Sequence, residues 1–82
     1  MDPRHVVSAV DLVPITPDDD TDLARPARAI RCKNNGTAGN VAFHTPNGVT
    51  RTTDIVEGET ILIQVKRVLA TGTTADGLEA ML

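Results

Sequence analysis

The 82-residue sequence contains no tryptophan or tyrosine, and it has only one phenylalanine and one cysteine. A lone cysteine cannot form an intrachain disulfide, and His5 and His44 lie too far apart in sequence to complete a metal site with Cys32. No apolar run approaches the roughly 20 residues of a membrane-spanning helix, and the first residues lack the pattern of a signal peptide. We therefore expect no cofactor, no structural metal, no disulfide and no membrane partner.

The apolar core available to this chain is small. Val, Ile, Leu and Phe number nine, five, six and one, which makes 21 of 82 residues. A chain of this length buries only roughly 60–65% of the surface that its unfolded state exposes, so burial barely offsets the loss of conformational entropy. Small domains without disulfides, metals or aromatic side chains often gain stability by burying surface against another subunit. The composition therefore predicts an oligomer or a partner-dependent protein.

The net charge of −3 conceals an uneven distribution along the chain. Residues 1–24 hold six aspartates against one arginine, whereas residues 25–33 hold three arginines and a lysine. Adjacent segments of opposite charge favour patches that complement each other or a partner. A nucleic-acid-binding protein would instead carry one dominant basic field.

Turn signals recur about every ten residues, which is typical of an all-β protein. Asn35-Gly36 and Asn47-Gly48 predict hairpins, because a type I′ turn requires positive φ, which Asn and Gly tolerate best. The runs between the turns are rich in β-branched residues, and eleven threonines add to that preference. These runs are residues 10–15, 27–33, 41–45, 49–56, 60–70 and 78–82.

Apolar and polar residues alternate within the runs, as expected for half-buried strands. Ile30 and Cys32 share one face of the second run, which predicts that Cys32 is a buried, unreactive thiol. The run at 60–70 has one apolar face, formed by Ile61, Ile63, Val65 and Leu69. We expect residues 65–69 to supply a central strand.

These patterns predict an all-β fold, a small antiparallel β-sandwich or barrel of about six or seven strands with an extended N-terminal arm. We assign residues 1–14 to the arm and residues 15–82 to a single β domain. The sequence carries no glycine-rich phosphate loop, no spaced pair of catalytic carboxylates and no serine-hydrolase motif. We therefore expect that the protein is not an enzyme and that it has no catalytic residues.

The acidic run at residues 18–22 is the most prominent local feature. Closely spaced carboxylates suit a hard cation such as Ca²⁺. The pattern fails as an EF-hand loop, because Leu23 stands where the glycine is needed and Ala29 where the bidentate glutamate is needed. The simpler interpretation is an acidic turn whose side chains bond nearby backbone amides.

The basic run at residues 25–33 suggests contacts with phosphate. Small β folds that bind nucleic acids usually offer aromatic side chains for base stacking, and this chain offers only Phe43. Its acidic net charge also opposes approach to a polyanion. We favour a solvated or intersubunit salt-bridging face, and we expect no direct contact with nucleic acid.

Three segments resemble the small spike base proteins on the capsids of tailed phages and phage-like gene transfer agents. The segments are I-T-P-D-D-D-T-D-L at 15–23, followed by Pro26, Arg28 and Ala29; E-G-E-T-I-L-I at 57–63; and V-K-R-V-L-A-T-G-T-T-A-D-G-L at 65–78. The likeness runs over most of residues 15–82. The third segment is the most specific, because its sequence is not that of a generic strand end.

The resemblance implies a structural virion component made in the bacterial cytoplasm and placed on the outer surface of the head. Copies would form a ring at the capsid vertices, contact the major capsid protein, and carry a spike or fibre protein that meets the host. The five-fold symmetry of a vertex makes a pentamer the natural expectation.

The charge distribution adds a hypothesis about how copies of the chain meet. We expect the acidic turn of one copy to contact arginines of the next. The residues in these expected contacts are Asp18, Asp19, Asp20, Asp22, Arg25, Arg28 and Arg67.

Two other functions remain open at this stage. One is a small β-barrel that binds nucleic acid through the basic run at 25–33. The other is a carbohydrate- or metal-binding module that uses the acidic turn at 18–22.

Overall fold

The computed structural model describes residues 11–82, and within that range the chain contains strands and turns but no helix. Hence no helix in the described part of the chain is long and apolar enough to cross a membrane. The seven strands are β1 (Leu12–Pro14), β2 (Ala29–Thr37), β3 (Gly39–His44), β4 (Thr50–Ile55), β5 (Thr60–Ile61), β6 (Arg67–Val68) and β7 (Asp76–Met81). The expected all-β fold is confirmed.

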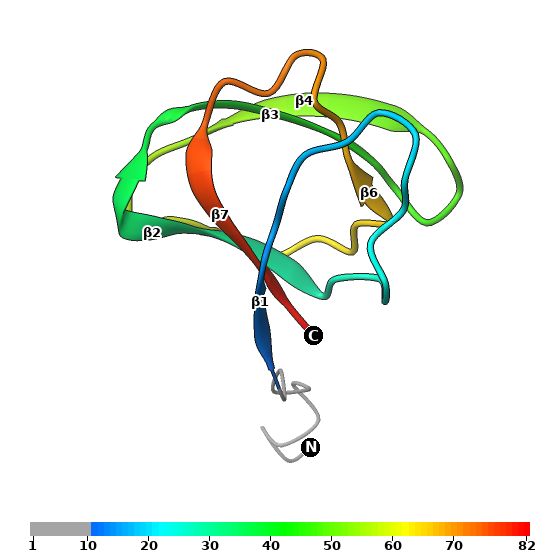
Figure 1. The fold of residues 1–82 in the computed structure, drawn as a ribbon, viewed down its shortest axis with the longest axis horizontal. Helices are drawn as coiled ribbons and strands as arrows, with labels where there is room; N and C mark the ends of the chain where they lie inside the picture. The colour runs from blue at the N-terminus through cyan, green and yellow to red at the C-terminus, as the bar shows by residue number, and fades with distance from the viewer. Residues whose placement is uncertain (1–10) are drawn as a thin grey trace.

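The strands form two antiparallel sheets that face each other (Figure 1). The first sheet has the order β1-β7-β2-β5, and the second has the order β4-β3-β6. The fold is thus a small sandwich, in which the middle strands β7, β2 and β3 each pair on both sides. Strand β1 lies within the range that we assigned to the N-terminal arm, and residues 1–10 lie outside the described residues.

The core lies between the sheets and consists mostly of aliphatic side chains. Its most deeply buried members are Ile30, Ile55, Val41, Val65, Val68 and Cys32. The predicted alternation is confirmed in β2, because Ile30 and Cys32 are fully buried while Lys33 is exposed. Cys32 is a free thiol whose burial raises its pKa, which fits the expected unreactive role.

The hairpin predicted at Asn35-Gly36 is wrong, because β2 continues through both residues to Thr37. The chain then passes at Ala38 into β3, in the other sheet. Gly36 is needed for space and not for a turn: a Cβ there would lie 2.5 Å from the Asp76 carbonyl oxygen. The sequence pattern predicted a turn because a glycine required for close packing has the same signature as a glycine required for positive φ.

The hairpin predicted at Asn47-Gly48 is confirmed, since it joins β3 to β4. Its turn differs from the expected type I′. Gly48 has φ of 83°, but no non-glycine among residues 11–82 has positive φ, so Asn47 does not adopt the conformation that type I′ requires. The Gly48 amide donates to the Thr45 carbonyl at 2.8 Å, which closes a turn that has Pro46 in its second position.

The single strand expected at residues 60–70 is also wrong. The run is split into β5, at an edge of the first sheet, and β6, at an edge of the second. Residues 65–69 therefore do not form a central strand. The residues between the two strands bring Leu62 to 86% exposure, and no glycine or proline marks the break. In the sequence, Ile61, Ile63 and Val65 alternate up to the break, but beyond it Val68 is buried and the expected Leu69 is only half-buried. The sequence pattern suggested one continued apolar face and therefore did not reveal the change of sheet.

Candidate assembly surface

The acidic turn at residues 18–22 lies along the outer edge of β6. The Asp18 amide donates to the Val68 carbonyl, and the Leu23 amide donates to the Lys66 carbonyl, both at 2.9 Å. These two bonds satisfy carbonyl groups that β6 turns away from β3. The turn thus covers a sheet edge of its own chain.

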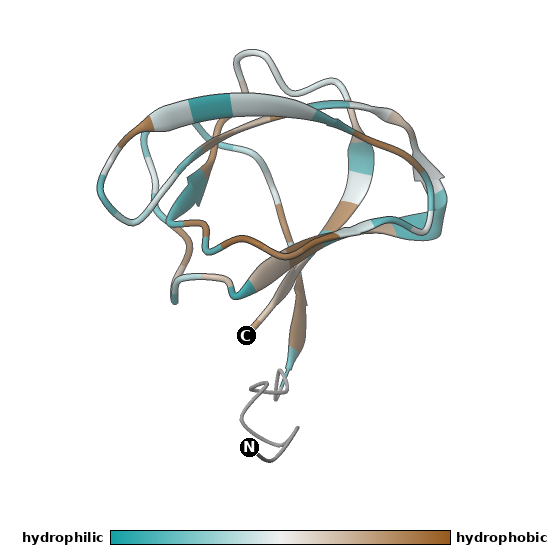
Figure 2. Ribbon diagram, turned by 180° about the vertical axis from the view of Figure 1, so that it is seen from behind, coloured by the Kyte–Doolittle hydropathy of each residue, from teal (hydrophilic) through white to brown (hydrophobic). Residues whose placement is uncertain are grey.

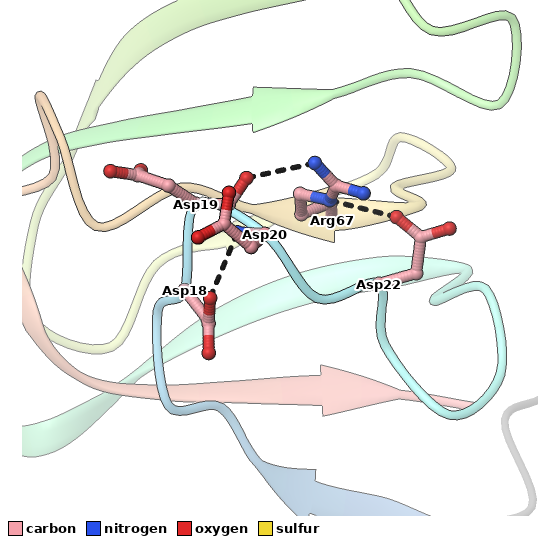
Figure 3. Close-up of polar contacts among 5 residues, drawn as sticks. All are labelled: Asp18, Asp19, Asp20, Asp22 and Arg67. Carbon is pink, nitrogen blue, oxygen red and sulfur yellow. Dashed lines mark hydrogen bonds and ion pairs between the residues drawn. The ribbon is translucent and has the colours of Figure 1, made fainter.

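The side chains of the turn hold it in this position (Figure 3). Asp18 Oδ1 accepts a 2.8 Å bond from the Asp20 amide, as expected for an aspartate in a turn. Asp19 accepts bonds from the Thr71 hydroxyl at 2.6 Å and from the Thr71 amide at 2.9 Å. The Thr71 hydroxyl, aided by the amide, lowers the pKa of the Asp19 carboxyl below its ordinary value.

Arg67 joins the two ends of the turn. Its Nε donates to Asp22 Oδ1 at 2.8 Å, and a terminal guanidinium nitrogen donates to the Asp19 backbone carbonyl at 2.8 Å. The Asp22–Arg67 ion pair is part-exposed, with side-chain exposures of 42% and 23%, so solvent weakens it. The contacts of Arg67 with Asp19 and Asp22 are therefore contacts within one chain.

The carboxylates of the turn do not converge on a common point. Asp18 and Asp22 point away from each other in Figure 3. No group of three or more His, Cys, Asp or Glu side chains in residues 11–82 is arranged to hold a metal ion. The carboxylates of Asp18, Asp19 and Asp22 each accept a hydrogen bond from the protein itself.

The basic run divides into two parts in the structure. Arg31 points to Glu79 on the neighbouring strand β7, and the two form a 2.9 Å ion pair. Arg25 and Arg28 precede β2, are exposed, and have no ion-pair partner among residues 11–82. Within the described residues, these two cations are therefore exposed and unpaired.

Arg25 borders two adjoining hollows. The first, of about 270 Å³, lies between β1, the loop at 22–25 and the end of β7; its lining residues are Val13, Pro14, Thr16, Asp22, Leu23, Ala24, Arg25, Ala80 and Leu82. The second, of about 310 Å³, shares Arg25 and Leu82 with the first and adds Pro26, Ala27, Arg28 and Gln64. The first hollow is mainly apolar, and Leu12 and Val13 beside it are 49% and 38% exposed.

We call the two hollows, the acidic turn and the exposed arginines the candidate assembly surface. Exposed aliphatic groups rimmed by charges of both signs are typical of a surface that contacts another protein. The sequence indicated its charged residues Asp18, Asp20, Arg25 and Arg28, but not the hollows. The hollows depend on how β1 and the end of β7 meet the loop at 22–25, and no local pattern reports that contact.

The fold is that of a small all-β sandwich, and its candidate assembly surface has the features of a contact with another protein. No protein-family model matches the chain, and no curated protein does. Among solved structures, the chain matches a chain in the capsid of a native gene transfer agent (GTA) particle computed with C5 symmetry. The two are 40% identical, with a TM-score of 0.76, and the match covers 98% of this chain and 99% of the other. The chain therefore belongs to the same family as that component of the GTA capsid.

Proposed function

We propose that this protein is a structural component of a phage-like particle. Its specific role is the base of a head spike or fibre, mounted on the outer surface of the head at the capsid vertices. There it links the major capsid protein to a host-binding spike protein. The observation that carries the proposal is the full-length likeness, at 40% identity, to a chain of a capsid computed with C5 symmetry.

The proposal fits the energetics of the isolated chain. Its core is formed by small and medium-sized side chains with a single aromatic, Phe43, and several aliphatic side chains remain exposed. Burying those side chains against neighbours adds stability that the chain cannot obtain alone. A ring of identical copies supplies such contacts, and five copies match the symmetry of a vertex.

The charges suggest how neighbouring copies meet in this ring. The carboxylates of Asp18 and Asp20 are exposed on the acidic turn, and Arg25 and Arg28 are exposed nearby. In the proposed contact, Asp18 and Asp20 of one copy face Arg25 and Arg28 of the next. Asp19, Asp22 and Arg67 serve this contact by holding the turn in shape.

The mass of the purified full chain, measured at low and at high salt, tests the ring and its charges. We expect a pentamer at low salt that shifts toward smaller species at high salt, because salt screens contacts between exposed charges. The double variant Arg25→Glu and Arg28→Glu should lose the pentamer, whereas Lys33→Glu, which reverses another exposed cation, should retain it.

Binding to assembled heads tests the spike-base role separately. The purified chain should bind heads that lack it, at up to five copies per vertex, and such heads should then bind the spike protein. A chain that binds neither heads nor spike protein would contradict the proposed role, whatever its oligomeric state.

A further inference from the structure

The two sheets have four outer edges, and the chain itself obstructs three of them. The backbone groups of Asp11, Val13 and Ile15 bond to β7. The backbone groups of Leu12 and Pro14, which lie between them, therefore face outward. Pro14 has no amide proton, and the Leu12 amide is occupied by Asp11 Oδ1 at 2.8 Å. The outer edge of β1 therefore offers no free amide donor for a further strand.

The edges at β6 and β5 are obstructed in other ways. The acidic turn covers β6 through the bonds from Asp18 and Leu23 described above. Strand β5 has only two residues, and a tight turn follows it, in which the Ile63 amide donates to the Ile61 carbonyl at 3.1 Å. An edge this short cannot hold a partner strand.

Strand β4 is the open edge in the described part of the chain. The Thr45 amide donates to the Val49 carbonyl, which sets the phase of the β3–β4 ladder. In an antiparallel ladder, every second residue bonds to the neighbouring strand. Counted from Val49, the residues of β4 that bond to β3 are Arg51, Thr53 and Ile55. The amides and carbonyls of Thr50, Thr52 and Asp54 therefore point outward, and these three residues are exposed.

The surroundings of this edge suit an apolar partner strand. Figure 2 shows β4 as a mainly polar strand, so its own side chains do not protect its backbone from solvent by packing. Val49 and Val56 lie just beyond its two ends and are 41% and 51% exposed. A strand that lies along β4 would satisfy six backbone groups and cover both valines.

We propose that the outer edge of β4 binds residues 1–10 of a second copy of this chain as an added strand. This segment contains Val6, Val7 and Val10, and from His5 to Val10 it carries no carboxylate, no basic Lys or Arg and no proline. Such a sequence favours β structure. Ten residues extend up to about 33–36 Å, whereas a six-residue strand spans about 20 Å, so the segment can reach and cover β4.

The positions of the two elements favour a second copy over the same copy. In Figure 1, β1 begins at the lower end of the molecule, whereas β4 lies at the top. The described part of the chain thus begins on the side away from β4 of the same copy. A contact between two different surfaces of identical copies is heterologous, and such contacts form a ring when the rotation from one copy to the next closes. The inference rests on the proposed assembly of copies and specifies one of its contacts.

Two variants remove the two halves of the contact. Thr52→Pro deletes an outward amide and leaves the β3–β4 ladder intact, because Thr52 does not donate to β3. The double variant Val6→Pro and Val7→Pro deletes two consecutive amides of the segment, one of which must face β4 in either register. The matched controls, Thr52→Ala and the double variant Val6→Ala and Val7→Ala, keep every backbone donor.

Native mass and amide hydrogen exchange of the full chain are the measurements. We expect the wild type and both controls to form an oligomer. In that oligomer, the amides of Thr50, Thr52 and Asp54 should exchange at least about tenfold more slowly than in the monomer obtained by dilution. Each proline variant should shift toward monomer and lose that protection at the remaining amides. A mixture of the two proline variants should form a heterodimer, because one retains the segment and the other retains the β4 edge.

Three results would overturn the inference. The first is fast exchange at Thr50, Thr52 and Asp54 in the wild-type oligomer; the ring proposed above would then stand on other contacts. The second is a double-proline variant with wild-type mass and protection, which would assign the β4 edge to another occupant, such as β4 of a second copy. The third is a wild-type chain that stays monomeric with fast exchange; the spike-base role would then depend on the head-binding test alone.

Discussion

At the scale of single residues, the acidic turn shows how a charged sequence motif can serve its own chain. Asp19 is exposed, yet its carboxylate accepts two hydrogen bonds from Thr71, 52 positions further along the chain. The motif that suggested a cation site or an intersubunit contact therefore also closes a loop over β6. Asp18 and Asp20 are also exposed, and their carboxylates make no hydrogen bond to a distant part of the described chain.

The lowered pKa of Asp19 gives a pH-dependent prediction. A folded-state pKa below the ordinary value of 3.8 stabilises the fold above that value, and the contribution disappears as the pH falls through the folded-state pKa. Thr71→Val, which removes the main cause of the lowered pKa, should reduce the melting temperature at neutral pH. The difference from wild type should become smaller as the pH falls below the ordinary value of 3.8. A Thr71→Val deficit that stays constant across this range would contradict the assignment.

At the scale of elements, the strand connections depend on glycines with different tasks. Gly48 adopts φ of 83° in the β3–β4 turn, and a Cβ there would meet nothing within 4 Å. Gly36 lies in β2, where a Cβ would contact the Asp76 carbonyl oxygen and, at 3.0 Å, Cys32 Sγ. The first position needs an unusual backbone conformation, and the second needs the absence of a side chain.

Substitution by asparagine separates the two requirements, because Asn tolerates positive φ but has a side chain. Gly48→Asn should lower the free energy of unfolding by less than about 1 kcal/mol. Gly36→Asn should lower it by about 1–3 kcal/mol or more, since the crowded atoms include backbone. Urea unfolding of the two variants measures the difference, and equal losses would contradict this division of roles.

At the scale of the whole molecule, stability and assembly should be linked. A small domain with exposed aliphatic side chains gains stability from any contact that forms only in the folded state. The melting temperature of the wild-type chain should therefore rise with protein concentration. The double variant Arg25→Glu and Arg28→Glu should melt at a temperature independent of concentration, and a wild type that behaves in the same way would contradict the linkage.

The candidate site was predicted in composition but not in arrangement. The sequence singled out the acidic turn and the arginines because charge is visible residue by residue. It could not show that Arg67 bonds to Asp22 in the same chain, because 45 positions separate the two residues and the contact exists only after β6 joins β3. It also could not show which of the arginines remain exposed, since Arg31 is paired with Glu79 only through the β2–β7 register.

The sequence by itself determined the fold class, the buried face of β2 and the hairpin at Asn47-Gly48. Each of these follows from local physics: β-branched composition, a period of two, and a turn that needs a residue tolerant of positive φ. The tertiary structure alone decided where the chain changes sheets and which sheet edge stays open. The changes fall at Ala38, between β4 and β5, between β5 and β6, and between β6 and β7. Where the chain changes sheet depends on which strands it pairs with, and an edge is open or covered only according to distant segments. Both therefore depend on long-range contacts that no local pattern encodes.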